Sequence, residues 1–280
     1  IFISDMIEIP ESTVLSHQMT ETLSGKRISD VMNATSLHRF TWFNGDPKRY
    51  PEILIGRTVK EVKGSGSFVD ILFDENVHLV VHDGVNLRYN SETEKCPSKF
   101  QLLIVFDDGS YLVFSVAMYG GIYAFSHDFE NSYYLGSFQK LSPLDDRFDL
   151  EYFHGLMKAT GKNLSVKALL ATEQRIPGLG NGVLQDILYN AGINPKSKIS
   201  TLSDNAIREL FTSIKNTLSE MISQGGRDTE KDIFGRNGGY RCKLSKNTYH
   251  ESCPRCGSRI MKEAYMGGSV YYCPSCQNLD

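Results

Sequence analysis

The sequence is poor in several features that mark whole classes of protein. Six cysteines in 280 residues are too few for a disulfide-based scaffold. Lysine and arginine number 30 against 33 acidic residues, so the net charge of −3 gives no general argument for a nucleic-acid partner. No apolar run approaches the roughly 20 residues that cross a bilayer. The hydrophobic fraction of 40% and charged fraction of 22% are those of globular proteins, which excludes disordered and collagen-like chains.

The first residues show no pattern typical of a targeting signal. Ile1–Asp5 is short and already acidic at Asp5, which does not fit a secretory leader. We therefore expect a cytoplasmic, monomeric protein with reduced cysteines, not secreted, without membrane contact, and associated with the nucleoid if it is bacterial. Met6 is the first methionine. The sequence leaves open whether the amino terminus of the functional protein is Ile1, Met6 or Ile7.

Charge is distributed unevenly along the chain. Residues 1–150 carry 13 basic and 21 acidic side chains, whereas residues 151–280 carry 17 and 12. Residues 233–262 contain seven basic side chains and one acidic side chain, Glu251. This cluster indicates an anionic partner on one face, and the alternative is a solvated loop. The seven basic residues are Arg236, Arg241, Lys243, Lys246, Arg255, Arg259 and Lys262.

The hydrophobic pattern changes midway. Residues 58–125 read as strands, with a hairpin signal at 107–109, which predicts an antiparallel sheet or sandwich. Core-spaced apolar residues over 14–23 predict a preceding helix that ends at Gly25. After Leu150 the apolar spacing becomes helical, and residues 233–280 return to short strands. The helices are predicted over 151–160, 165–173, 182–191 and 203–224.

The four cysteines near the carboxyl terminus have the spacing of a metal site. Cys253-Pro-Arg-Cys256 and Cys273-Pro-Ser-Cys276 are separated by sixteen residues, enough for a β-hairpin. Four thiolates can bind one Zn²⁺ tetrahedrally, and four protein ligands leave no open position, so the zinc is expected to be structural. Two disulfides or a redox motif are the alternatives. Cys96 and Cys242 are expected to be ordinary thiols.

A second motif is the glycine-rich segment 176–182. Gly178 and Gly180 allow a close approach of the backbone, and a predicted helix follows at once. Amides at that helix start can bind a phosphate, with Asn181 as an additional donor. The alternative is a simple turn. The segment is not a dinucleotide-binding fingerprint, because no strand precedes it and the third glycine is missing.

The segment from Ala168 to Asn181, continuing to Pro195, resembles the helix–two-turn–helix motif of the formamidopyrimidine-DNA glycosylase / endonuclease VIII family of repair enzymes. Residues 225–240 resemble that family's linker to its zinc hairpin. Met6-Ile-Glu-Ile-Pro-Glu11 is similar to the family's amino-terminal Met-Pro-Glu-Leu-Pro-Glu, and residues 55–59 are similar to part of its sandwich domain. The resemblance covers nearly the whole chain from Met6 onward.

The resemblance implies an α+β fold in three parts. These are an amino-terminal antiparallel β-sandwich over 1–142, a helix–two-turn–helix DNA-binding domain over 143–232 and a zinc-ribbon β-hairpin over 233–280. It also implies base-excision repair, in which a glycosylase with abasic-site lyase activity binds double-stranded DNA and flips out a damaged base. Two alternatives stay open: a non-catalytic protein of the same fold that binds damaged DNA, and a zinc-ribbon adaptor between proteins.

The resemblance also suggests roles for individual residues. Glu8 stands at the family's catalytic glutamate, and Glu11 at a second glutamate that supports it. The alternative is that both are ordinary acids favoured by the dipole at a helix start. Asn181 is expected to contact phosphate. Lys167 is either a DNA-binding residue or a plain surface lysine.

Several residues that have functional roles in the family are replaced in this chain. The position of the nucleophilic proline is Ile7, whose nitrogen can attack only if it is a terminal amine. The position of the family's β-hairpin lysine is Ser67. If catalysis survives, Glu8 would act with a terminal amine or an activated water.

The expected DNA-inserting residues also differ. They fall near Val85 and Met118, where an arginine is missing and Met118 can wedge between bases. The arginine at the tip of the zinc hairpin is replaced by Gly268. Arg259 and Lys262 on the opposite strand of the hairpin are expected to compensate in part as DNA contacts.

Overall fold

The computed structural model describes residues 6–34, 37–91, 96–161 and 163–279. Residues 1–5, on which the position of the amino terminus of the functional protein depends, lie outside the described residues.

The amino-terminal lobe contains α1 (Ile9–Leu23), β1 (Ile28–Asn33), β2 (Thr41–Phe43), η1 (Pro47–Arg49), α2 (Tyr50–Leu54), β3 (Val59–Ser65), β4 (Phe68–Phe73), η2 (Asp74–Asn76), β5 (His78–Asn90), β6 (Leu102–Phe106) and β7 (Tyr111–Phe125). The helical lobe contains α3 (Ser132–Gln139), α4 (Leu150–Ala159), α5 (Val166–Ala171), α6 (Asn181–Ala191), η3 (Ile199–Thr201) and α7 (Asp204–Ser223). The hairpin consists of β8 (Met261–Tyr265) and β9 (Gly268–Tyr272).

The predicted antiparallel sheet and the helical second half are both confirmed. The strand order is β1-β6-β7-β5-β4-β3, and β2 pairs in parallel with β7. The register of β5 against β7 shifts between Asp83 and Val85. This irregularity leaves Asp83 with a φ of 55°, and its carbonyl accepts a hydrogen bond of 2.9 Å from the nitrogen of Ile7. The sheet therefore fixes the start of the described chain.

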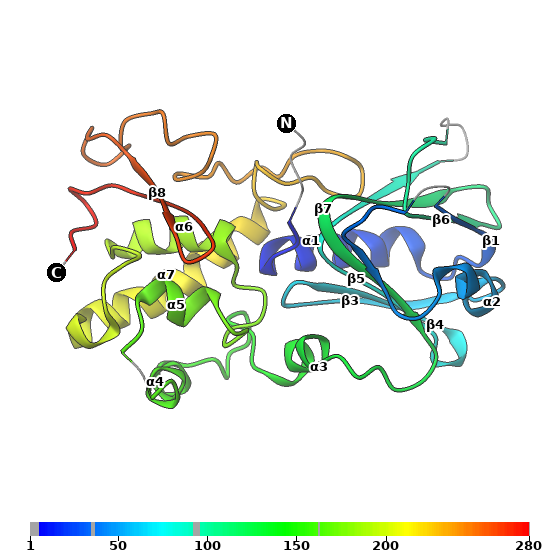
Figure 1. Cartoon of the computed structure of the whole chain (residues 1–280), viewed down its shortest axis with the longest axis horizontal. Helices are drawn as coiled ribbons and strands as arrows, with labels where there is room; N and C mark the ends of the chain where they lie inside the picture. The colour runs from blue at the N-terminus through cyan, green and yellow to red at the C-terminus, as the bar shows by residue number, and fades with distance from the viewer. Residues whose placement is uncertain (1–5, 35–36, 92–95, 162, 280) are drawn as a thin grey trace.

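Helix α1 joins the two lobes. It begins with a reciprocal capping box, in which Glu8 caps the helix and the Glu11 side chain accepts from the Glu8 nitrogen. Ile9 packs in the core of the helical lobe, whereas Leu15 and Met19 pack in the core of the amino-terminal lobe, which we also call the sheet lobe. Figure 1 shows the amino-terminal end of α1 between the lobes. The first turn of α1 is therefore placed at their junction.

The four helices predicted after Leu150 begin and end within two residues of the predicted positions. Ser165 and Ser203 each accept a hydrogen bond from the amide three residues later. Helix α5 ends at Ala171 rather than at residue 173, because Glu173 and Gln174 both have positive φ. The short elements β1, β2, α2 and α3 were not predicted. No helix of the described part of the chain is long and apolar enough to cross a membrane.

The carboxy-terminal hairpin is docked on α6. The carboxylate of Asp186 accepts hydrogen bonds of 2.8 Å from the amides of Lys243 and Leu244, and Gln185 Oε1 accepts one of 3.0 Å from the amide of Tyr271. A small cluster of buried residues, which includes Tyr189 of α6, lies between the hairpin and the helix. The hairpin is thus positioned relative to the start of α6.

Candidate active site and nucleic-acid interface

A cavity of about 420 Å³ lies where both lobes and the hairpin meet. It brings together segments that are far apart in the sequence, and we call it the central cavity. Several predicted site residues line it: Ile7, Glu8, Ser67, Met118, Asn181 and Gly268. Glu8, which caps α1, and the first residues of α6, Asn181 and Gly182, line it together. A site at a junction of this kind can accommodate a ligand that contacts both lobes.

The carboxylate of Glu8 is buried, and both of its oxygens are hydrogen-bonded. Its two carboxylate oxygens accept hydrogen bonds of 2.9 and 2.7 Å from the amides of Gly182 and Val183 in the first turn of α6. Arg227 Nη1 lies 3.4 Å from Oε2. Burial raises the pKa of Glu8 above its ordinary value, against the opposing effect of Arg227. Glu8 is therefore both a helix cap and a carboxyl group that can exchange a proton at the central cavity.

Three carboxylates surround the guanidinium of Arg227, which is 2% exposed. Glu11 accepts from Arg227 Nε at 2.9 Å and from Nη2 at 2.6 Å, and Glu8 and Glu230 lie within 4.0 Å. Burial alone would lower the pKa of Arg227, but Glu11 and Glu8 raise it well above its ordinary value. Glu11 thus holds Arg227 in place beside Glu8, and its support of catalysis stays a prediction.

The glycines of the motif at 176–182 leave room for this cluster. A Cβ at Gly182 would lie 1.8 Å from Arg227 Nη1, and a Cβ at Gly180 would lie 2.3 Å from Glu8 Oε1. Any larger residue would displace one of the two charged side chains. The glycine spacing in the sequence therefore reflects contacts with residues of α1 and the linker.

We expect Arg227→Met to lower the free energy of unfolding by about 3–5 kcal/mol, because the buried carboxylates would lose their countercharge. Chemical denaturation at neutral pH measures the change. Arg208→Met on the exposed side of α7 is the matched control. A loss below about 1 kcal/mol for Arg227→Met, within the range of ordinary substitutions, would contradict a stabilising role.

Asn181 begins α6 and contacts the hairpin tip. Its Nδ2 donates a hydrogen bond of 2.9 Å to the carbonyl of Ser269, and a Cβ at Gly268 would lie 3.5 Å from its side chain. Its buried Oδ1 has no hydrogen-bond partner among the described residues. Asn181 therefore links α6 to the hairpin at the edge of the central cavity, and its contact with phosphate stays a prediction.

Of the two positions expected to insert into DNA, Met118 is accessible and Val85 is not. Met118 is 53% exposed and lines the central cavity, whereas Val85 is 1% exposed in the core of the sheet lobe. The side chain of Val85 is therefore packed in the core, and insertion into DNA at Met118 stays a prediction. Tyr119 lines the central cavity beside Met118. The centre of its ring lies 6.0 Å from the ring centre of the exposed Trp42. The sequence interpretation missed both aromatic residues.

Three predicted DNA contacts lie outside the central cavity. Lys167 is 3% exposed and donates a hydrogen bond of 2.6 Å to the carbonyl of Tyr265, so it is not a surface lysine. Burial lowers its pKa. Lys262 lies 4.9 Å from the ring centre of Tyr249, and Arg259 is exposed just before β8. DNA binding by these residues stays a prediction.

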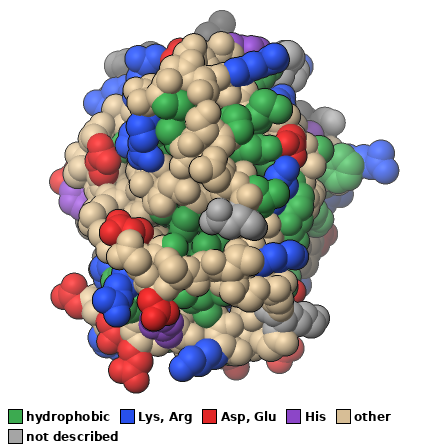
Figure 2. Space-filling view, turned by 90° about the vertical axis from the view of Figure 1, so that its left-hand side faces the viewer, with side chains coloured by type: hydrophobic (Ala, Val, Ile, Leu, Met, Phe, Trp, Pro, Cys, Tyr) green, Lys and Arg blue, Asp and Glu red, His purple; other side chains and the backbone are tan. Residues whose placement is uncertain are grey.

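The surface of the helical end carries mixed charges. Figure 2 shows lysine and arginine side chains separated by acidic ones on this face. Two members of the basic cluster are paired with acids, Arg236 with Asp232 and Arg241 with Glu251. Basic side chains therefore do not form one continuous patch on the face shown, and part of the basic cluster is neutralised by neighbouring acids.

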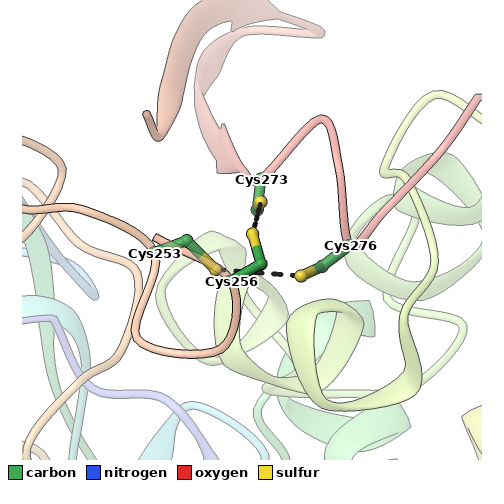
Figure 3. Close-up of side chains that lie close together, drawn as sticks. All are labelled: Cys253, Cys256, Cys273 and Cys276. Carbon is green, nitrogen blue, oxygen red and sulfur yellow. Dashed lines mark hydrogen bonds between the residues drawn. The ribbon is translucent and has the colours of Figure 1, made fainter. Parts of the chain in front are cut away.

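The four cysteines of the predicted metal site converge, as Figure 3 shows. Their sulfurs all lie within 4.8 Å of one another, with 3.8 Å between Cys253 and Cys276 and 3.4 Å between Cys256 and Cys273. Zinc–sulfur bonds of about 2.3 Å in a tetrahedron require sulfurs about 3.8 Å apart, so the cluster fits such an ion. These sulfurs are not disulfide-bonded. The cluster could hold a metal ion.

The comparisons with known proteins agree with this arrangement. The family description "Formamidopyrimidine-DNA glycosylase N-terminal domain" matches residues 6–117, and "Formamidopyrimidine-DNA glycosylase H2TH domain" matches residues 140–232. The chain belongs to the formamidopyrimidine-DNA glycosylase family. A formamidopyrimidine-DNA glycosylase of Brevibacillus brevis is 29% identical, with 97% of this chain and 99% of that protein covered. One of Rickettsia peacockii is 28% identical with the same coverage.

Solved structures of this family share the fold. The MutM (Fpg) protein of Thermus thermophilus has a TM-score of 0.79 at 21% identity, covering 98% of this chain and 99% of that chain. The Lactococcus lactis Fpg in complex with DNA containing an abasic site has a TM-score of 0.81 at 22% identity, covering 97% and 99%. The sequence matches therefore support membership of the family, and the structural matches support the fold.

Two charged residues of the site were missed by the sequence interpretation. Arg227 and Glu230 lie in the segment that resembles the family linker, but no pattern distinguished them from solvated charges. The available signal was the pair of glycines at 225 and 226, which places a turn directly before Arg227. Their importance follows only from their burial against α1.

Proposed function

We propose that this protein is a base-excision DNA glycosylase with abasic-site lyase activity, which acts as a monomer on double-stranded DNA. Its family membership supports the activity, and its relatives of known structure include Lactococcus lactis Fpg in complexes with DNA containing an abasic site and with DNA containing a FAPY-dG. The observation that carries the proposal is the central cavity, which joins a buried glutamate to the start of a helix.

The roles of the residues follow from their positions. Glu8, with its raised pKa, exchanges protons at the sugar or base. Asn181 contacts a backbone phosphate of the DNA, whereas the amides of Gly182 and Val183 at the start of α6 are already bonded to Glu8. Met118 and Tyr119 fill the space that a flipped nucleotide leaves. Cys253, Cys256, Cys273 and Cys276 hold one structural zinc ion, which orders the hairpin beside Asn181.

A second cavity gives the flipped base a place to go. It has a volume of about 180 Å³ and shares Asn181, Gly182, Arg227 and Glu230 with the central cavity. Tyr271 adds an aromatic side to it. We propose that a base rotated out of the duplex enters this cavity, because stacking and polar contacts can then replace those lost in the helix.

Activity on synthetic duplexes tests the proposed function. Duplexes that contain a formamidopyrimidine or an abasic site are incubated with the protein, and undamaged duplex is the control. We expect free base from the first, strand cleavage of both and a covalent adduct on reduction with borohydride. Specific binding without any of these products would favour the non-catalytic alternative. Absence of salt-dependent binding would favour the adaptor.

We expect Asn181→Ala to weaken binding to damaged and undamaged duplexes alike, because a phosphate contact carries no sequence information. Titrations at moderate salt measure the dissociation constants. Asn190→Ala is the matched control, since Asn190 lies in the same helix but its side chain bonds to Thr217. Equal affinities of Asn181→Ala and wild type would remove Asn181 from the interface.

A further inference from the structure

Asp83 is a carboxylate of the central cavity to which the proposed function gives no role. It lies at the irregularity of β5, where its φ of 55° is unusual for a residue with a side chain, and such outliers are found preferentially at functional sites. Its side chain is 32% exposed and lines the central cavity together with Glu8. Burial, followed by the charges of Asp83 and Glu8, raises the pKa of Tyr119. Both carboxylates therefore lie close to one side chain of the same cavity.

A histidine and a tyrosine hold the side chain of Asp83. Asp83 Oδ2 lies 3.0 Å from His82 Nδ1, and His82 Nε2 lies 2.9 Å from the hydroxyl of Tyr123. A carboxylate only accepts hydrogen bonds, so His82 Nδ1 donates, and in the neutral imidazole Nε2 accepts from the tyrosine. The ring of Phe68 lies 4.8 Å from that of His82, and a Cβ at Gly121 would lie 2.2 Å from His82 Nε2. Close packing thus fixes a chain of carboxylate, imidazole and hydroxyl groups.

The second oxygen of Asp83 is available to a ligand. Within the described part of the chain, the side chain of Asp83 is paired through Oδ2 with His82, and Oδ1 has no such partner. A cavity of about 360 Å³ lies beside the central cavity and is lined by His82 and Tyr123. The two cavities share Ser67, Asp83 and Gln174. Water can therefore reach Asp83 from either cavity.

The positions at which the family resemblance places amines do not provide them in this chain. The nitrogen of Ile7 follows Met6, so it is a peptide nitrogen, and it donates a hydrogen bond of 2.9 Å to the carbonyl of Asp83. Ser67 stands at the position of the β-hairpin lysine. A peptide nitrogen and a hydroxyl cannot form an imine with the sugar. Water beside Asp83 is a nucleophile that this arrangement allows.

We propose that base release is hydrolytic, that Asp83 is the general base for the attacking water, and that His82 is a positioning residue for Asp83. This inference rests on the proposed function and specifies its first step. The water oxygen forms a bond to C1′ and gives a proton to Asp83. The glycosidic bond breaks, and its electron pair leaves with the base, which takes a proton from Glu8. Two carboxyl groups divide the hydrolysis of other glycosidic bonds in the same way.

The products of this step are a free base and an abasic sugar with a hydroxyl group at C1′. Asp83 then returns its proton to solvent, and Glu8 takes one up. The abasic site becomes the substrate of the proposed lyase activity in a separate, later step. Base release and covalent attachment to the sugar are therefore not coupled.

Single-turnover reactions of the full chain on a formamidopyrimidine duplex test this order of events. Free base, strand breaks before and after treatment with hot alkali, and the adduct trapped by borohydride are followed in parallel. We expect free base to appear about tenfold faster than trapped adduct or more, with an uncut, alkali-sensitive site accumulating in between. Base release and trapping at equal rates would show attack by an amine and would overturn the inference.

Asp83→Asn tests the general base. Asparagine keeps the size of the side chain and tolerates the left-handed conformation, but it cannot accept the proton. We expect base release to fall about 10²-fold or more, because the attacking water loses its base. Affinity for an abasic duplex, and trapping on that duplex, are expected to stay within about twofold of wild type. Asp107→Asn, in the exposed turn after β6, is the matched control, and thermal unfolding verifies that each variant is folded.

His82→Gln tests the positioning residue, with the protein in excess and the duplex saturated. We expect base release to slow about tenfold in the single variant and to show no further loss when the substitution is added to Asp83→Asn. A residue that acts through Asp83 has no effect once the carboxylate is gone, whereas an independent structural role would add its own loss.

The remaining outcomes separate failure of this inference from failure of the proposed function. Base release by Asp83→Asn at the wild-type rate, or an equal loss of trapping on the abasic duplex, would overturn the inference while the proposed function stands. Additive losses for the two substitutions would overturn the role of His82. If the wild type neither releases base nor is trapped, the proposed catalytic function fails, and this inference fails with it.

Discussion

Replacement of Cys256 by serine is expected to release the metal ion and to weaken DNA binding. Structural zinc in small domains contributes apparent binding energies of about 10–16 kcal/mol, which is the largest single contribution expected here. The hairpin has only a small buried cluster of its own, so it depends on the ion and on its contacts with α6. When the hairpin loosens, Asn181 loses its bond to Ser269, and the edge of the central cavity is no longer fixed.

Elemental analysis gives the test, with one zinc per chain expected for the wild type and none for Cys256→Ser. Hydrogen exchange at Tyr271 reports the order of the hairpin. Cys96→Ser is the matched control, because Cys96 is exposed and outside the cluster. A metal-free protein whose carboxyl terminus keeps its exchange protection would show that the cluster does not need an ion.

Glu8→Gln is expected to reduce base release by about 10²–10⁴-fold, the usual contribution of a general acid or base. Glutamine keeps the size of the side chain but cannot exchange a proton, so the affinity for DNA should stay nearly unchanged. Single-turnover kinetics on a formamidopyrimidine duplex measure the loss. The variant also tests whether Glu8 acts only as a helix cap, which would leave catalysis unaffected.

The structure adds a requirement for this experiment. Glutamine can accept a hydrogen bond at only one of its two terminal atoms, so either Gly182 or Val183 loses its acceptor at a cost of about 1–3 kcal/mol. Thermal unfolding must therefore accompany the kinetics. Glu21→Gln is the control in the same helix, because Glu21 is exposed. A Glu8→Gln protein that is folded and releases base at the wild-type rate would contradict a catalytic role.

Features that depend on residues close together in the chain could be predicted before the structure was known. Cysteine pairs at fixed spacing predicted the cluster at 253–276, and the change of hydrophobic period located the sheet and the helices. These signals are local, because capping, turn formation and amphipathic spacing involve residues within a few positions of one another. The resemblance to a repair family extended them to Glu8 and Asn181.

The burial of several charged groups in one cluster depends on long-range packing and could not be predicted. Arg227 and Glu230 come from a linker, yet they meet Glu8 because α1 and α6 begin at the same junction. Burial removes water from such groups, and this changes their pKa values and makes their pairing obligatory. The same long-range packing buries Lys167 and Val85, which the sequence could not distinguish from exposed residues.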